Sequence, residues 1–292
     1  MDTGSSVRRS WKAALVLTPA ILIGSAAPVS ARRLEKHFKV DARPVVTIHN
    51  PNGTVTVKAW TRSEVLVIAD LIGGQADVGA EQNGNHVDVM TRQLSDNISP
   101  DDLRADYQVN VPQDAELQIH NDSGGVSVAN VLGDMNVETV AAGVDLQDVA
   151  GYLTVKTVGG SFECLRCAGR VEANSISGNF RLVDMRSKHI HAQTSTGNIL
   201  FSGEFLPDGE YRLRNYSGVI ELRFAPGDSF DLTATSFKGK VNNQAKLIPP
   251  AHSLRSAPRN GNALVAGSLN AAGHARVDLT SFDGTINVVK RD

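Results

Sequence analysis

Residues Met135 to Lys188 contain one 18-residue unit written three times, and this repeat constrains the fold more than any other feature of the chain. Each copy holds two short runs in which apolar and polar residues alternate, which is the pattern of a half-buried strand. Small residues such as Gly160 and Gly169 separate the runs. A strict repeat of this length is typical of a solenoid, whose units bury their apolar faces only against their neighbours. The copies are MNVETVAAGVDLQDVAGY, LTVKTVGGSFECLRCAGR and VEANSISGNFRLVDMRSK.

The repeat extends beyond these three copies when every unit is aligned on its turn residue. The aligned turn residues are Gly53, Gly124, Ala142, Gly160, Gly178, Gly197, Gly218, Gly239 and Gly284. Two positions after the turn, every unit has an apolar residue: Val55, Val126, Val144, Phe162, Phe180, Ile199, Ile220, Val241 and Ile286. Apolar residues also occupy the positions five before and four after the turn, where Asn243 is the one polar exception. Coils stacked in register would join these positions into a continuous core.

A polar column lies three positions before the turn in all nine units. Short polar side chains of this kind bond to nearby backbone and tolerate turn geometry. In stacked coils they could also bond to the equivalent residue above and below. We therefore interpret the column as a structural ladder with no catalytic chemistry. Its members are Asn50, Asn121, Thr139, Thr157, Ser175, Thr194, Asn215, Ser236 and Ser281.

The predicted fold class is all-β: a parallel β-solenoid, that is, a single-stranded β-helix, of about eight coils. The 26 glycines and few aromatic residues suit many short strands with tight turns. General chain chirality favours right-handed winding, although coils of 18 residues also suit the left-handed type.

The repeats are expected to fill residues 117–290, after an irregular β-rich N-terminal segment at 32–116. In that segment Val45 to Trp60 reads as two strands about the turn signal Asn52-Gly53. A loop insertion at 247–273 interrupts the repeats, with a strand expected near Ala263 to Leu269. The final unit, Arg276 to Val289, is expected to close the stack.

The first 31 residues have the form of a signal peptide. A basic region contains Arg8, Arg9 and Lys12, an apolar region runs from Ala13 to Gly24, and Val29-Ser30-Ala31 is a small-residue cleavage site. We predict cleavage after Ala31; an uncleaved N-terminal anchor is the alternative. No transmembrane span is expected after signal removal, so the protein is expected in the periplasm, in the outer cell envelope or secreted.

The repeated pattern apolar-x-apolar-x-(Thr/Ser/Asn)-x-(Ser/Gly)-Gly-x-apolar-x-apolar resembles that of the putative-adhesin family of exported bacterial β-strand-repeat proteins. The likeness covers roughly residues 34–290 and includes the closing segment TSFDGTINV. The resemblance implies a β-solenoid at the cell envelope, a domain of unknown function with no assigned catalytic residue. No functional residue can be transferred from it.

The pair Cys164 and Cys167 forms a CxxC motif, which in other settings indicates redox or metal chemistry. Here Cys164 occupies the apolar column of Leu146 and Leu182, and free cysteine behaves as a small buried hydrophobe. Core packing is therefore our first interpretation. A disulfide is the alternative, because export would allow one.

Other candidate sites have weaker support. His189 and His191 share one strand face, but two ligands without a third favour an exposed face over a metal site. The outward column three after the turn includes Asp145, Glu163 and Arg181, whose opposite charges in adjacent coils are typical of a solvated face. We expect no catalytic residue, metal or other cofactor. A net charge of −2 gives no electrostatic case for nucleic acid.

Tyr216, Phe237 and Phe282 share the column two before the turn. We expect this column to be a semi-buried corner; if it is exposed, it makes a stripe that could dock a partner. The sequence thus indicates an exported, non-enzymatic protein, an adhesin or a structural and interaction protein of the envelope, with an unidentified protein or glycan partner. The alternative is a polysaccharide lyase or glycoside hydrolase built on a β-helix.

Overall fold

The structure, a computed structural model, describes Met1 and residues 32–96, 98–249, 263–270 and 275–291. The predicted signal peptide with its Ala31 cleavage site, and residues 250–262 and 271–274 of the predicted insertion, lie outside the described residues. The described chain is all-β with mostly parallel pairing, and it includes no helix long and apolar enough to span a membrane. Its elements are β1 (Arg32–Lys39), β2 (Val45–Trp60), β3 (Glu64–Leu71), β4 (Ala76–Asn83), β5 (His86–Gln93), the 3-10 turn η1 (Pro100–Leu103), β6 (Ala105–Pro112), β7 (Glu116–Ala129), β8 (Met135–Thr139), β9 (Gly143–Gln147), β10 (Ala150–Thr157), β11 (Phe162–Leu165), β12 (Ala168–Ser175), β13 (Phe180–Thr196), β14 (Ile199–Gly203), β15 (Glu210–Phe224), β16 (Phe230–Ser236), β17 (Lys240–Asn243), β18 (Ala263–Leu269) and β19 (Ala275–Lys290).

Each 18-residue unit contributes one strand run to a first face and one to a second face, and the apolar columns are buried. On the first face, β10 pairs in parallel with β8 and β12; on the second, β11 pairs in parallel with β9 and β13. The sequence period becomes the pairing register, because Phe162 lies beside Val144 on one side and beside Phe180 on the other. The apolar columns predicted from the alignment are confirmed at these positions.

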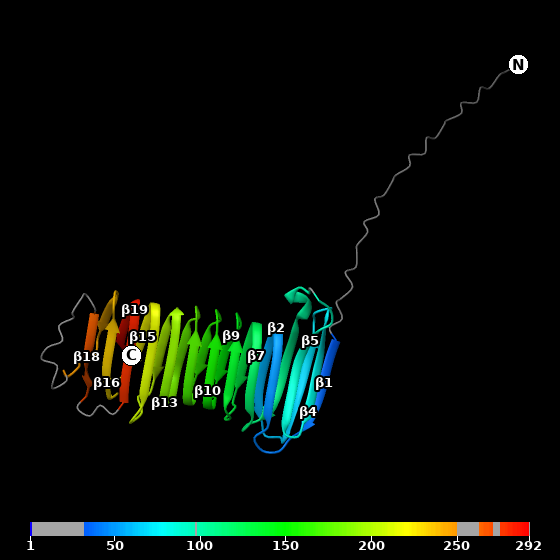
Figure 1. Ribbon diagram of the computed structural model, residues 1–292, viewed down its shortest axis with the longest axis horizontal. Helices are drawn as coiled ribbons and strands as arrows, with labels where there is room; N and C mark the ends of the chain where they lie inside the picture. The colour runs from blue at the N-terminus through cyan, green and yellow to red at the C-terminus, as the bar shows by residue number, and fades with distance from the viewer. Residues whose placement is uncertain (2–31, 97, 250–262, 271–274, 292) are drawn as a thin grey trace. The chain divides into compact units, whose positions relative to one another are not determined.

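The order of the coils differs from the order of the sequence at the C-terminal end. β19 pairs in parallel with β15 on one side and with β16 and β17 on the other, so it lies between them (Figure 1). The expectation that Arg276 to Val289 closes the stack is therefore wrong. β16 and β17 form the last described coil, and the predicted strand β18 pairs antiparallel with β16. Asn243 is exposed there, because no described coil stacks on β17 to enclose it.

β2 is likewise out of sequence order at the N-terminal end, where it lies between β7 and the pair β5 and β6. The signal at Asn52-Gly53 is a bend inside one continuous strand, not a turn between two strands. Gly53 has φ +119°, and a Cβ on it would lie 2.2 Å from the carbonyl oxygen of Ala105. Only glycine fits this bend, because other residues rarely adopt such a φ and the neighbouring backbone leaves no room.

Side chains tie the two edge strands of this end together. The guanidinium of Arg32 on β1 donates to the carbonyl oxygen of Ala76 on β4 (2.8 Å), and Nζ of Lys36 donates to that of Ala80 (2.7 Å). Charged side chains on an edge strand disfavour pairing with another chain. The described N-terminal edges are therefore protected against end-to-end association.

Candidate functional site

The predicted polar column lies at the bends, and eight of its nine side chains are buried, Ser175 being the exception. The backbone N–H of Gly160 donates to Thr157 Oγ1 in the same coil (2.9 Å). Thr194 Oγ1 donates to the carbonyl oxygen of Gly178 in the neighbouring coil (3.1 Å). Apart from the bond that Thr91 Oγ1 donates to Asn50 Oδ1, the hydrogen bonds found for the column join side chains to backbone, not equivalent side chains to one another. The column is positioned to stabilise the bends and is too buried to contact a ligand.

Cys164 and Cys167 form a disulfide with a Cα–Cα separation of 5.9 Å. Both residues are fully buried, and Cys164 lies between Leu146 and Leu182 in the core column. The structure therefore has the second of the two arrangements that the sequence leaves open. As the chain has only these two cysteines, it has no free thiolate to act as a nucleophile or a metal ligand in this state.

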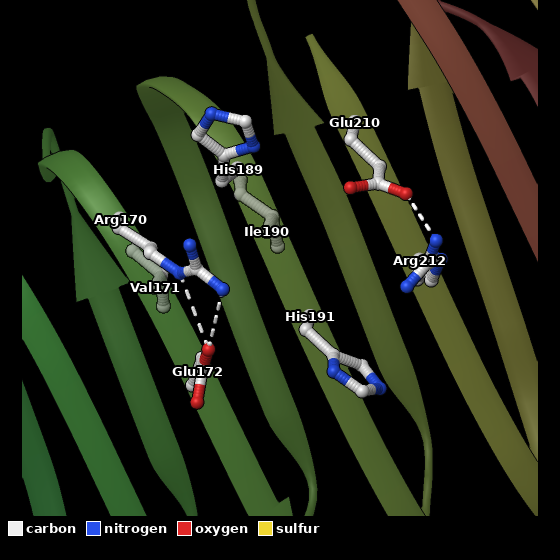
Figure 2. A pocket seen from close by; sticks show the side chains of 8 residues that line it. All are labelled: Arg170, Val171, Glu172, His189, Ile190, His191, Glu210 and Arg212. Carbon is white, nitrogen blue, oxygen red and sulfur yellow. Dashed lines mark hydrogen bonds and ion pairs between the residues drawn. The ribbon is translucent and has the colours of Figure 1, made fainter.

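A charged groove lies on the first face where β12, β13 and β15 run side by side (Figure 2). Arg170 and Glu172 form an ion pair on β12 (3.0 Å), and Glu210 and Arg212 form one on β15 in the opposite order. The predicted pair His189 and His191 shares the face of β13 between them. Opposite charges thus alternate both along and across the strands, which is typical of a solvated face.

The charged groove does not have the properties of a metal or ligand site. Burial, then the positive charges of Arg214 and Arg212, lowers the pKa of His191, so the ring is neutral near pH 7. Its Nε2 is buried and has no partner among the described residues. The cavity measures about 50 Å³, which is enough for water but not for a larger ligand. No group of three metal-ligating side chains suited to a metal occurs in the described part of the chain.

Two histidines that look isolated in the sequence are in contact. The rings of His49 and His120 stack with their centroids 4.7 Å apart. Burial, and then the charge on His120, lowers the pKa of His49. The repeat alignment could have predicted this contact. Each histidine lies four positions before its turn glycine, and the two coils are adjacent.

A mixed polar and apolar hollow of about 470 Å³ lies on the second face, over β9, β11, β13, β14 and β15. Asp145, Glu163 and Arg181 of the predicted outward column meet in it with Leu200 and Glu221 of the same column, and Arg181 is paired with Glu163 (3.0 Å). Leu200 and Val219 form its apolar part. The floor is the core column beneath, with Phe162, Phe180 and Ile199 almost fully buried.

Unused hydrogen-bonding groups line one side of this hollow. Asn179 Oδ1 accepts from the backbone N–H of Asn198 (2.9 Å), and Asn198 Oδ1 accepts from that of Val219 (2.8 Å). These bonds use the amide oxygens and leave both Nδ2 groups free of bonds to the described residues. The hollow can therefore offer amide donors, a carboxylate and an apolar patch to the same ligand. Sequence reasoning missed it because the column looked like a uniformly solvated face.

Replacement of Asp145 by Asn is expected to stabilise the protein near neutral pH. Burial, and then the negative charge of Glu163, raises the pKa of Asp145 above its ordinary value of 3.8. A group with a raised pKa in the folded state contributes stability at low pH, and this contribution is lost as pH rises through the folded pKa. Melting temperatures should show Asp145→Asn above the parent at pH 7, with the gain disappearing toward about pH 3. Asp283→Asn, an exposed change of equal charge, is the control; an equal gain in both variants would contradict the expectation.

Most of the column two before the turn is exposed, whereas Phe282 and Pro51 are half-buried, so the expectation of a semi-buried corner is wrong for the other members. Tyr216 is 57% exposed, Ile176 59% and Phe237 42%. The residue just before each of these lies in the polar column and points inward, so its successor points outward. We call this row the edge stripe. In coil order, after Pro51 of β2, it consists of Asp122, Val140, Val158, Ile176, Ser195, Tyr216, Phe282 and Phe237.

A comparison with one solved structure agrees with this architecture. The crystal structure of a putative adhesin from Bacteroides fragilis matches with a TM-score of 0.51 and 12% identity, covering 89% of this chain and 99% of that chain. At this identity the match supports the fold alone. A putative cell adhesion protein from Clostridium sporogenes also covers 89% of this chain and 100% of its own, at 12% identity and a TM-score of 0.27. No curated protein matches the chain.

The putative-adhesin resemblance seen in the sequence is confirmed by a family model. The model described as Toastrack DUF4097 matches residues 45–289, from the first residue of β2 to the last but one of β19. Since this match covers most of the sequence, the chain belongs to the Toastrack DUF4097 family.

Proposed function

We propose that the protein is an exported, non-enzymatic β-solenoid with right-handed winding that acts as an adhesin or as an interaction protein of the cell envelope. The hollow on the second face is the observation that carries this proposal. It combines free amide donors on Asn179 and Asn198 with the apolar side chains of Leu200 and Val219. Such a mixture suits binding of a polar polymer or a protein segment, because a few placed polar groups orient a ligand over an apolar surface.

The proposed organisation assigns a signal peptide to residues 1–31, with cleavage after Ala31. Residues 32–116 form the N-terminal end of the stack, and residues 117–290 form the solenoid with its insertion at 247–273. Export would place the protein in the periplasm, in the outer cell envelope or outside the cell. The Bacteroides fragilis protein with a similar fold is described as a putative adhesin.

Ion pairs within the protein favour a binding function over a catalytic one. Arg181 is tied to Glu163 in the hollow, as Arg170 is to Glu172 on the first face. A catalytic arginine or carboxylate must be free to meet the reacting atoms. A partner, either an envelope protein or a glycan, would instead meet a preformed surface.

A polysaccharide lyase or glycoside hydrolase is the second candidate, and the position of Asp145 favours it. Asp145 has a raised pKa and lies one coil from Glu163. A carboxyl group with a raised pKa near an ionised one is the arrangement that glycosidases use as acid and nucleophile or base. This candidate would place the chemistry in the same hollow.

Purified protein should be screened against envelope and plant glycans and against envelope proteins, with binding and product release measured in parallel. We expect saturable binding without turnover, and weaker binding by Leu200→Glu, which places a charge in the apolar part of the hollow. Thr56→Glu lies in the same outward column on β2, outside the hollow, and is the matched control. Release of reducing ends with multiple turnovers that Asp145→Asn abolishes would establish the second candidate. Equal loss of binding in both glutamate variants would show that the hollow is not the site.

A further inference from the structure

The edge stripe is continuous along the stack because neighbouring bends are hydrogen-bonded. The backbone N–H of Gly159 donates to the carbonyl oxygen of Val140 (2.8 Å), that of Ser177 to Val158 (2.9 Å), and that of Thr196 to Ile176 (2.8 Å). Each bond joins one coil to the next, so the exposed side chains are held in a straight row. Val140 is 49% exposed and Val158 45%. A row of exposed apolar side chains of this length is uncommon on a monomeric protein.

The edge stripe has two unlike halves separated by a notch. Ser195 lies between Ile176 and Tyr216 and is the one small residue that interrupts the row of apolar side chains. Neighbouring strands are about 4.8 Å apart, so Ile176 and Tyr216 are about 10 Å apart along the row. The space above Ser195 is therefore about one side chain wide.

We propose that the edge stripe joins two copies of this chain in an antiparallel, two-fold symmetric dimer. The two-fold axis passes between Ile176 and Ser195, so that Ile176 of each copy fills the notch above Ser195 of the other. An isologous interface requires a self-complementary patch, and the pairing of a large residue with a notch one position away meets this requirement.

The same register matches the two halves of the edge stripe. Val158 lies opposite Tyr216, and Val140 lies opposite Phe282, so that the aliphatic half of each copy covers the aromatic half of the other. Aromatic side chains bury a large area at little cost in rotamer entropy, which makes them effective at interfaces.

Charges at the two ends of the edge stripe are complementary in this register. The aliphatic half ends at Asp122 and the aromatic half ends at Phe237 with Lys238 beside it; Asp122 and Lys238 are both exposed. Nζ of Lys238 lies 4.9 Å from the ring centroid of Phe282. The antiparallel arrangement places Asp122 of one copy near Lys238 of the other, whereas a parallel arrangement would place like charges together.

Two other occupants fit the edge stripe less well. Glycans stack on exposed ring faces, but Tyr216 and Phe282 stack on each other, with centroids 4.7 Å apart and an interplanar angle of 15°. A lipid surface is attracted by free basic residues, whereas beside the aliphatic half Asp122 is acidic and Lys156 is already paired with Glu138 (3.0 Å). A second copy satisfies both halves.

The proposed dimer does not depend on the proposed adhesive function. Dimerisation would, however, strengthen adhesive binding. Two copies present two hollows, and a polymer that meets both gains affinity by multivalency without any new contact.

Sedimentation velocity over a concentration series tests the dimer directly. We expect a dimer in purified protein at about 100 µM. In Ile176→Asp the dimer dissociation constant should rise by about a hundredfold or more, because a charge would be buried in the notch. Asn174→Asp, an exposed change two residues earlier on β12, is the control and should keep the dimer. Circular dichroism checks that both variants fold. A parent protein that stays monomeric, or equal effects of the two variants, would overturn the proposal.

Disulfide trapping tests the orientation. The double variant Asp122→Cys with Lys238→Cys should give a covalent dimer under mild oxidation. The single variant Asp122→Cys should not, because the two copies of this residue lie about 34 Å apart, seven strand spacings, in the antiparallel register. Efficient trapping of the single variant, or none of the double variant in a protein that sediments as a dimer, would contradict the proposed register.

Discussion

Deletion of Leu153 to Arg170 is expected to leave a cooperatively folded protein, whereas deletion of Leu153 to Ser161 is expected to unfold it. The longer deletion removes one period and joins Tyr152 to Val171. Leu153 pairs with Met135 on one side and with Val171 on the other. After the deletion Val171 takes the place of Leu153 beside Met135, so the pairing register is kept. In a quasi-one-dimensional stack, stability is close to a sum over units and their interfaces, so the loss should be roughly a few kcal/mol.

The shorter deletion joins Tyr152 to Phe162 and removes the first-face run of one coil. The following second-face run would then have to occupy the first face, and turn residues would lie in core columns. Strand-type circular dichroism and a cooperative thermal transition are expected for the 18-residue deletion only. Equal unfolding of both variants would show that the core is not built from independent, stacked periods.

Gly124→Ala is expected to destabilise the protein by about 3 kcal/mol, because it adds both steric overlap and backbone strain. Gly124 has φ +102°, and a Cβ on it would lie 2.1 Å from the carbonyl oxygen of Gly53 in the adjacent coil. The three nearest atoms are all backbone atoms of Gly53, which cannot move aside as the end of a flexible side chain could. Urea unfolding measures the change in the free energy of unfolding.

Gly125→Ala is the matched control for this substitution. A Cβ on Gly125 would have no atom within 4 Å, and its φ lies outside the positive region. Its effect should stay within about 0.5 kcal/mol of the parent. If both variants lose the same stability, the close stacking of bends at Gly53 and Gly124 is not what limits this position.

The sequence was sufficient to predict the middle of the stack because each unit there carries the same information. Val144, Phe162 and Phe180 have the same place relative to their turns, and they pair in that register. Burial of the polar column follows from the same alignment, since its residues alternate with outward ones. The partner atoms of the column could not be predicted, because a short hydroxyl side chain reaches the bend of its own coil and that of the next almost equally well.

The order of the ends could not be predicted from the repeat. β19 and β16 have the same apolar pattern, so either fits beside β15, and only tertiary packing selects β19. Nothing in the repeat alignment distinguishes the unit of β16 from that of β19.

The exposure of the edge stripe depends on the bend itself. Val140 and Tyr216 look like corner residues in the sequence, but an inward residue precedes each, so both point outward. The hollow was hidden for a different reason: its lining comes from five coils, and only their stacking brings Asp145, Asn198 and Leu200 to one place. A site assembled across coils leaves no local motif.

Distances between spin labels test the stacking order most directly. Tyr152, Arg276 and Asp231 lie in one outward row, in which Tyr152 and Arg276 are separated by Arg170, His189 and Glu210. Asp231 is paired directly with Arg276 on the far side. Labels can be attached selectively, because both native cysteines are bonded to each other.

The double variant Tyr152→Cys with Arg276→Cys should give a label separation near 19 Å, and Tyr152→Cys with Asp231→Cys one near 24 Å, from four and five strand spacings of about 4.8 Å. Dilution with unlabelled protein removes distances between copies. We expect the label at position 276 to lie closer to the label at position 152 than the label at position 231 does. The opposite order, with Asp231 closer to Tyr152 than Arg276, would mean that the coils stack in the order of the sequence and would contradict the structure described here.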